Sequence, residues 1–294
     1  MSNSINYPLV SICIPTYNGE IFIQEALESA ISQTYSNLEI IVSDDASTDK
    51  TLDIINTYKN KTEIPIYGFN HQPNGIGANW NHCVKKSNGE FIKFLFQDDV
   101  LESNCISKMM GIMLSSARIG LVYCKRKFLY KSLTLKVQHF LNHYGDLTSH
   151  WDSIKVKEGV VDGKLYLRDR TLLLSPKNKI GEPTAVLLRK TCFQQVGFFN
   201  EVMKQTLDFE YWYRVMTQYH IGFVNEKLVH FRLHEQQASN INKKQKIPDA
   251  ELLNKLYYKY LFWYLHPINK LKLLKLYHPL FKLLTRLKRK INAN

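Results

Sequence analysis

The chain has 294 residues, 45% hydrophobic and 22% charged, which suits a large α/β domain and excludes a chain that is disordered throughout. Its 39 Lys and Arg residues outnumber 26 Asp and Glu residues, and the formal net charge is +13. Residues 251–294 hold ten Lys or Arg against the single acid Glu251, which leaves +9 there and +4 on the first 250 residues. This division argues against nucleic-acid binding by the body of the chain.

The five cysteines form no C-x-x-C pair and no Cys/His cluster, so we expect neither a disulfide framework nor a zinc site. They are Cys13, Cys83, Cys105, Cys124 and Cys192. The N-terminus lacks the pattern of a signal peptide, and no apolar run approaches the ~18 residues of a membrane span. These features favour a protein of the reducing cytoplasm.

Short apolar runs alternate with segments of helical periodicity in the first 100 residues. Strands are predicted over 8–14, 38–42, 64–69 and 91–96, and helices over 21–31, 50–58 and from the turn at 74–77 to 86. Strands that alternate with helices predict a mainly parallel, doubly wound α/β sheet with helices on both faces.

The pattern weakens from 121 to 179. Beyond 121 we predict strands at 160–161, 185–188 and 228–231, a helix from Asp162 to about Leu174, and a helix over 208–216. The body of the chain is expected to end near residue 240.

Polar residues follow three of the predicted strands, at 16–18, 44–45 and 97–99. Ligands of such sheets bind beyond the carboxyl ends of the strands, so these clusters predict one site. Tyr17 can stack on a flat base, or it can simply belong to a turn. Asp45 can accept a hydrogen bond from a base or a ribose hydroxyl, whereas Asp49 is interpreted as a helix cap.

The segment Asn74-Gly75-Ile76-Gly77 precedes a predicted helix. Glycine lets the backbone approach a ligand closely, and a helix N-terminus favours anions. A plain turn is the alternative interpretation.

Asp98 and Asp99 lie side by side at the end of an apolar strand, which is electrostatically unfavourable unless a cation neutralises them. Their hard oxygen atoms suit Mg²⁺ or Mn²⁺, and a solvated turn is the alternative. His234 can bind the same metal or a phosphate, or it can be structural.

Asp208 and Glu210 begin a predicted helix and lie two positions apart, so they cannot share a helix face. One of them can serve chemistry while the other serves the helix. Glu210 is predicted to form a surface ion pair with Arg214, four positions on. Asp208 is left open between a chemical role and a helix cap.

The basic C-terminal segment carries an apolar stripe at Leu253, Leu256, Tyr257, Tyr260, Leu261 and Tyr264, and a second at Leu280, Leu284, Leu287 and Ile291. Basic amphipathic helices can lie on an anionic leaflet, which predicts membrane association through 251–294. The alternative is a helical subdomain that packs on the body or on a second copy of the chain.

Taken together, these segments resemble glycosyltransferase family 2, the inverting nucleotide-sugar transferases with a GT-A fold. The matching segments cover residues 8–240 and read, in order, V-S-I-C-I-P-T-Y-N, V-S-D-D-A-S-T-D, Q-P-N-G-I-G-A-N-W-N, G-E-F-I-K-F-L-F-Q-D-D-V-L, G-E-P-T-A-V-L-L-R, V-G-F-F-N-E, L-D-F-E-Y-W-Y-R and F-R-L-H. The resemblance implies a Rossmann-like GT-A domain over 1–240, with a donor half over about 1–120 and an acceptor half over about 121–240. A basic amphipathic helical tail over 241–294 would follow it.

The resemblance also implies residue roles on the donor side. Tyr17 would stack on the nucleobase in a pocket lined by the backbone of Pro15, and Asp45 would bind the base. Asn74 and Gly75 would contribute to the same nucleotide site.

For the chemistry, the resemblance implies that Asp98 contacts the ribose or diphosphate and that Asp99 coordinates Mg²⁺ or Mn²⁺, with Asp98 and His234 as further ligands. Asp208 would be the general base. Many relatives have an acid where this chain has Phe96 and another where it has Leu207.

The implied activity is transfer of a sugar from a nucleoside-diphosphate sugar, with UDP as the first expectation, to a lipid-linked or glycan acceptor in bacterial polysaccharide, O-antigen or capsule assembly. The enzyme would work at the inner face of the cytoplasmic membrane, and a homo-oligomer is left open. A nucleotide-sugar-forming nucleotidyltransferase and a basic nucleic-acid-binding protein are the alternative hypotheses.

Overall fold

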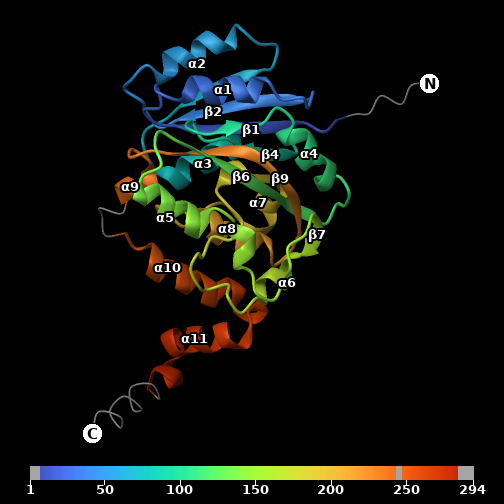
Figure 1. The fold of residues 1–294 in the computed structure, drawn as a ribbon, viewed down its shortest axis with the longest axis vertical. Helices are drawn as coiled ribbons and strands as arrows, with labels where there is room; N and C mark the ends of the chain where they lie inside the picture. Colours follow the sequence, from blue (N-terminus) through green and yellow to red (C-terminus); the bar gives the residue numbers. More distant parts are fainter. Residues whose placement is uncertain (1–6, 243–246, 284–294) are drawn as a thin grey trace, which may run out of the picture.

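The structure is a computed structural model that describes residues 7–242 and 247–283. Within these ranges nine strands form one mixed sheet in the order β3-β2-β1-β4-β8-β6-β9-β5, with β7 paired to β9 (Figure 1). The strands of the first half are β1 (Val10–Thr16), β2 (Leu38–Asp44), β3 (Ile66–Asn70) and β4 (Phe91–Phe94), all parallel to one another. The prediction of an α/β fold is confirmed.

The alternation of side chains along β1 explains why helices cover both faces of the sheet. Ile12 packs in one core with helices α1 (Ile23–Ile31), α2 (Thr51–Lys59) and α4 (Cys105–Met113). The next residue, Cys13, packs in the opposite core with α3 (Ile76–Lys86) and α8 (Leu207–Val215). Every residue of β1 is buried, so the side chains on both faces of this strand pack against a covering layer.

The second half departs from the parallel pattern. Strand β8 (Val186–Arg189) is antiparallel to both β4 and β6 (Ile119–Tyr130), while β6 runs parallel to β9 (His220–Leu233). The short strands β5 (Val100–Leu101) and β7 (Gly159–Asp162) are antiparallel to β9. Strand β6 was not predicted, and β9 was predicted only over 228–231, because their outer halves are not uniformly apolar and their pairing joins distant segments.

The remaining helices are α5 (Leu135–Tyr144), α6 (Gly163–Leu167), α7 (Thr191–Val196), α9 (Ala238–Asn242), α10 (Asp249–Leu256) and α11 (Pro267–Tyr277). The carboxylate of Asp162 accepts a hydrogen bond from the backbone amide of Lys164, so the predicted cap of α6 is confirmed. The prediction that this helix continues to Leu174 is wrong, because α6 ends after Leu167.

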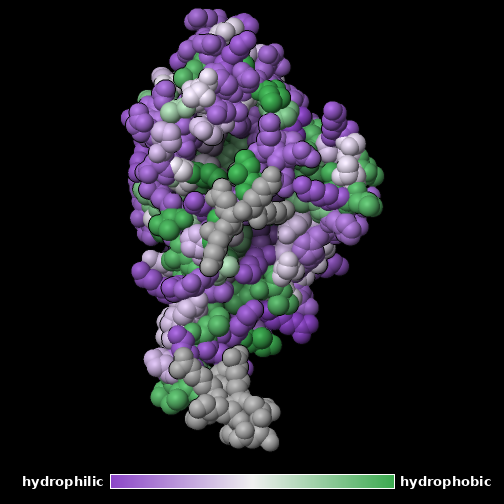
Figure 2. Space-filling view, turned by 90° about the vertical axis from the view of Figure 1, so that its left-hand side faces the viewer, coloured by the Kyte–Doolittle hydropathy of each residue, from purple (hydrophilic) through white to green (hydrophobic). Residues whose placement is uncertain are grey.

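The first apolar stripe of the C-terminal segment packs inward. Leu253, Tyr257 and Leu261 lie in the same core as α3 and α8, so this face supports the alternative of a helical subdomain that packs on the body. Hydrophobic and hydrophilic residues mix on the surface of the lower part of the molecule, where α10 and α11 lie (Figure 2). The second predicted stripe falls outside the described residues from Leu284 onward, and no helix in 7–242 or 247–283 is both long enough and apolar enough to cross a bilayer.

Candidate active site

A pocket of about 370 Å³ opens beyond the carboxyl ends of β1 and β4, where the sequence placed a ligand site. Of the predicted site residues, those on its wall are Pro15, Tyr17, Asp45, Gly75, Asp98, Asp208 and His234. Asn74 and Asp99 do not line the pocket. The tertiary structure therefore brings together most of the predicted residues from six separate segments of the chain.

The loop after β1 is held to the loop after β4 by the side chain of Gln97. Its carbonyl oxygen accepts a hydrogen bond from the amide of Tyr17 at 2.9 Å, and its amide group donates to the carbonyl of Tyr17 at 3.0 Å. A Cβ on Gly19 would lie 2.4 Å from Oε1 of Gln97, so the close contact requires glycine at that position. The phenol ring of Tyr17 is 55% exposed, which leaves its face free to stack on a base.

Asp45 lies on the pocket wall, and its carboxylate accepts a hydrogen bond from the backbone amide of Asn74 at 3.2 Å. The backbone of Asn74 thus helps to fix the carboxylate of Asp45, and Gly75, at φ +90°, lines the pocket. Burial raises the pKa of Asp45 above its ordinary value. Asp49 caps α2 by accepting a hydrogen bond from the amide of Thr51, as predicted.

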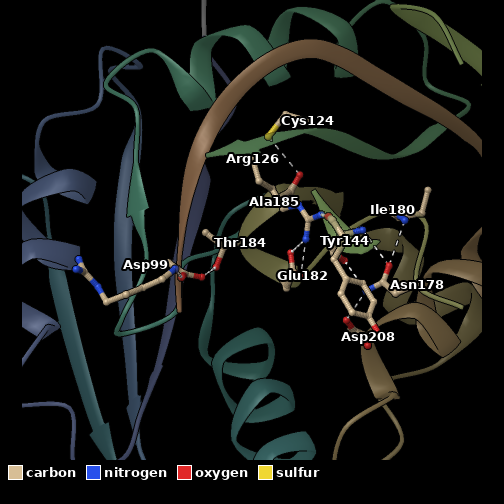
Figure 3. Close-up of polar contacts among 12 residues, drawn as sticks. Asp99, Cys124, Arg126, Tyr144, Asn178, Ile180, Glu182, Thr184, Ala185 and Asp208 are labelled. Atoms are coloured by element: carbon tan, nitrogen blue, oxygen red, sulfur yellow. Dashed lines mark hydrogen bonds and ion pairs between the residues drawn. The ribbon is translucent and has the colours of Figure 1, made fainter. Parts of the chain in front are cut away.

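The two adjacent acids after β4 differ in position. Oδ2 of Asp98 lies 2.8 Å from Nε2 of His234, and both side chains line the pocket. Asp99 is 1% exposed, and its carboxylate accepts hydrogen bonds from the Thr184 hydroxyl at 2.6 Å and the Arg232 amide at 3.0 Å (Figure 3). Burial, with the neighbouring charge of Asp98, raises the pKa of Asp99 well above its usual range.

This placement differs from the sequence prediction, which made Asp99 the principal metal ligand. Both oxygen atoms of Asp99 already accept hydrogen bonds below the pocket surface, whereas Asp98 and His234 reach the pocket. Within the described residues no cluster of three or more His, Cys, Asp or Glu side chains is assembled for a metal. One carboxylate and one imidazole nevertheless fit Mg²⁺ or Mn²⁺, which complete their coordination with water and substrate phosphates.

Asp208 occupies the far side of the pocket, at the start of α8. The Nδ2 group of Asn178 donates to its Oδ2 at 2.8 Å, whereas its Oδ1 is buried and has no hydrogen-bond partner among the described residues (Figure 3). Burial, and to a lesser degree the charge of Glu182, raises the pKa of Asp208 to about 8. A buried carboxylate with one unpartnered oxygen can accept a proton from a bound hydroxyl group.

Glu210 faces away from the pocket and pairs with Arg214, with Nε of Arg214 2.8 Å from Oε1 of Glu210. The predicted pair is confirmed, but its predicted surface position is wrong, since Glu210 is 2% exposed. Arg214 also donates to the backbone carbonyls of Val196 and Phe198, which anchors α8 to the loop after α7. Asp208 therefore lines the pocket, whereas Glu210 forms a buried ion pair away from it.

Three residues of the site were not singled out from the sequence. Glu182 lines the pocket and pairs with Arg126, whose side chain is 4% exposed; Asn178 orients Asp208; and Gln97 joins the two loops. The segment G-E-P-T marked Glu182 as part of a motif without indicating its task. No local signal marked Asn178, because its amide is oriented by the backbone of Ile180 and Gly181 in an irregular loop.

Residues 11–173 match the family model described as glycosyl transferase family 2. The chain is 31% identical over 242 residues to an uncharacterized glycosyltransferase of Rickettsia typhi, covering 82% of this chain and 69% of the relative.

Among solved structures, S. aureus TarS 1–349 in complex with UDP-GlcNAc superposes with a TM-score of 0.58 at 20% identity, covering 86% of this chain and 71% of that one. Mannosyltransferase PcManGT from Pyrobaculum calidifontis, in complex with GDP-Man and Mn²⁺, superposes with a TM-score of 0.58 at 14% identity, covering 99% and 82%. These likenesses confirm the expected GT-A arrangement of the sheet and its helices.

Proposed function

The chain belongs to glycosyltransferase family 2 and is a glycosyltransferase, and on this basis we propose that it transfers a sugar from a nucleoside-diphosphate sugar to an acceptor hydroxyl with inversion at the anomeric carbon. The observation that carries the proposal is the unpartnered, buried Oδ1 of Asp208, which lies in one pocket with Tyr17 and Asp45. The pocket thus offers a surface for a base at one side and a proton acceptor at the other.

In the proposed reaction, the nucleobase stacks on Tyr17 and hydrogen-bonds to Asp45, which orients the donor. Asp208 then accepts the proton of the acceptor hydroxyl as that oxygen attacks the anomeric carbon and the bond to the diphosphate breaks. Asn178 keeps the carboxylate of Asp208 in place through Oδ2, so Oδ1 remains free for the proton. A single displacement of this kind inverts the anomeric configuration.

The negative charge of the leaving diphosphate requires positive partners. Asp98 and His234 would hold a divalent cation, which acts as a Lewis acid toward the diphosphate when it is bound. Lys204 also lines the pocket and can place its ammonium group near the same charge. Of the three predicted metal ligands, we keep Asp98 and His234 and leave out Asp99, because Asp99 does not line the pocket.

The candidate donors are sugars linked to UDP, GDP or dTDP. UDP-GlcNAc in TarS and GDP-Man with Mn²⁺ in PcManGT make the first two the leading candidates. The test is a screen of all three classes with Mg²⁺ or Mn²⁺, measuring thermal stabilisation and the anomeric configuration of the product by NMR. One donor class should stabilise the protein and yield an inverted product, whereas retention of configuration would disprove the single displacement.

The acceptor is proposed to be a lipid-linked molecule or a glycan, reached from the inner face of the cytoplasmic membrane. Support comes from α11 and the short 3-10 helix Phe262–Tyr264 before it, which expose apolar residues beside Lys270, Lys272 and Lys275. These apolar residues are Trp263, Ile268, Leu271 and Leu276. Such a mixture suits an anionic lipid surface, where an aromatic ring sits at headgroup level and lysines meet the lipid charges.

A further inference from the structure

A second cavity, of about 630 Å³, lies on the acceptor half of the chain. Its walls come from the outer half of β6, the end of α5, the short helix Leu147–His150 and one residue of β9. Four basic side chains line it and one acid does: Lys125, Arg126, Lys127 and Lys227, with Asp146. None of these residues belongs to the donor pocket described above.

Two of the four basic residues have no carboxylate in ion-pair contact among the described residues. Lys127 pairs with Glu102, and Arg126 pairs with Glu182. Lys125 and Lys227 have no such pair, although they are direct partners across the parallel ladder of β6 and β9. The register of the ladder shifts on both sides of Lys125, and Lys227 is exposed, so the two ammonium groups lie at an irregular part of the sheet. Their like charges repel each other, and a bound anion would offset this repulsion.

The carboxylate of Asp146 does not neutralise the positive charge of Lys125 and Lys227. Its carboxylate accepts hydrogen bonds from the backbone amide and the hydroxyl of Thr148, at 3.0 and 2.6 Å, and so caps the short helix. The charge of Lys125 contributes to lowering the pKa of Asp146, behind these larger hydrogen-bond effects. Two lysines thus face a single carboxylate that already has other partners.

The second cavity and the donor pocket share a wall. Arg126 lines the second cavity, and its NH1 group donates to Oε1 of Glu182 at 2.6 Å, while Glu182 lines the donor pocket together with Asp208 (Figure 3). The same guanidinium group donates to the carbonyl of Tyr144. A molecule bound in the second cavity is therefore separated from the donor pocket by one ion pair.

We propose that the second cavity binds a phosphate group carried by the acceptor, held by Lys125 and Lys227. This inference rests on the proposed transfer to an acceptor hydroxyl. Two unpaired ammonium groups match the charge of a phosphate ester, for which lysine is a common ligand. Phe128, Tyr130 and Leu147 add apolar surface to the cavity wall, which suits the carbon skeleton next to the phosphate.

The test uses the full chain and the double variant Lys125→Ser/Lys227→Ser. The control, Lys155→Ser/Lys157→Ser, removes the same charge from two exposed positions outside both cavities. Binding of glycerol 3-phosphate and of glycerol is measured by calorimetry. We expect the cavity variant to bind glycerol 3-phosphate at least ~10-fold more weakly than the wild type, and the control to bind it as the wild type does.

Equal affinity of the cavity variant and the wild type, or no binding by the wild type, would overturn the proposal. Donor binding is followed in parallel by thermal shift with UDP-GlcNAc and GDP-Man. If the wild type binds glycerol 3-phosphate through these lysines but transfers sugar from no donor, the proposed function fails and the phosphate site stands.

The source of the phosphate is resolved by two acceptor arms. One offers a soluble oligomer of glycerol phosphate, and the other a polyprenyl-phosphate-linked sugar in phosphatidylcholine vesicles. The transfer rate of the cavity variant is compared with that of the control in each arm. If the rate falls in one arm alone, the acceptor of that arm carries the phosphate that the cavity binds. Undiminished transfer in both arms would contradict the acceptor role.

Discussion

The carboxylate of Asp249 in α10 accepts a hydrogen bond from the amide of Thr206, the residue before α8, at 2.9 Å. It also accepts hydrogen bonds from the Thr206 hydroxyl and from the amides of Lys204 and Gln205. Asp249 is 2% exposed, so water cannot take the place of its carboxylate as the acceptor for these donors. The C-terminal segment therefore holds the start of the helix that carries Asp208.

Asp249→Ala should lower the free energy of unfolding by about 2–3 kcal/mol, because three backbone amides just before α8 lose their buried acceptor. It should also lower transfer, since Asp208 lies two residues beyond Thr206. Chemical denaturation and initial rates check both effects. Glu251→Gln in the same helix is the control, because its pair with Lys255 is exposed to solvent and adds little to stability. An Asp249→Ala protein as stable as this control would contradict the capping role.

Asp208→Asn should reduce the transfer rate at least ~100-fold, because the hydroxyl proton has no acceptor. The same variant should be more stable than the wild type at pH 8. Since the pKa of Asp208 is raised to about 8 from an ordinary value near 4, the folded wild type must hold a proton that the unfolded chain releases between these pH values. The raised pKa of Asp208 therefore lowers the free energy of unfolding of the wild type as pH rises from 4 to 8.

Denaturant titrations of both proteins at pH 4 and pH 8 measure this difference. The stability gain of Asp208→Asn should exceed about 1 kcal/mol at pH 8 and shrink toward pH 4. A stability gain that is the same at pH 4 and pH 8 would show that ionisation of the Asp208 carboxyl group does not cause it.

Glu182→Gln should shift the pH dependence of transfer. The negative charge of Glu182 contributes to raising the pKa of Asp208, so its removal lowers that pKa, and the unpaired Arg126 acts in the same direction. In the wild type, kcat/KM should rise with pH toward a plateau as Asp208 loses its proton, with a midpoint near pH 8. The midpoint of Glu182→Gln should lie at lower pH. An unchanged or higher midpoint would argue against Asp208 as the titrating group.

Asp98→Ala and Asp99→Ala should differ in kind. Asp98 lines the pocket beside His234, so its loss should raise the Mn²⁺ concentration for half-maximal activity at least ~10-fold with little change in stability. Loss of Asp99 leaves the Arg232 amide without its acceptor and should lower the free energy of unfolding by about 1–3 kcal/mol. Metal titrations and denaturation curves separate the two, and the opposite order would restore Asp99 as the metal ligand.

Trp263→Ala should weaken binding of the full chain to anionic vesicles by about tenfold, because the ring is 83% exposed and is available for burial at the lipid interface. Leu114→Ala, at an exposed position at the end of α4, is the control. Flotation with phosphatidylglycerol vesicles measures the bound fraction. Equal flotation of the two variants would remove Trp263 from the membrane contact.

Local sequence determined the first half of the fold and the position of most residues that line the pocket. Apolar runs followed by Tyr17, Asp45 and Asp98 predict strand ends, and the carboxyl ends of parallel strands meet at one edge of a sheet. The pairing of β6 with β9 and the irregular loop of Asn178 were not predictable in this way, because they depend on contacts between distant segments.

Only the tertiary structure distinguishes two adjacent residues of the same type by their positions. Asp98 and Asp99 are indistinguishable as neighbours in the sequence, yet one reaches the pocket and the other is buried under Thr184 and Arg232. The charge of +13 divides into a nearly balanced body and a basic C-terminal segment on sequence grounds alone. That α10 packs into the core and binds the residues just before α8 through Asp249 follows only from the tertiary structure, because a periodic pattern does not identify the partner of a buried face.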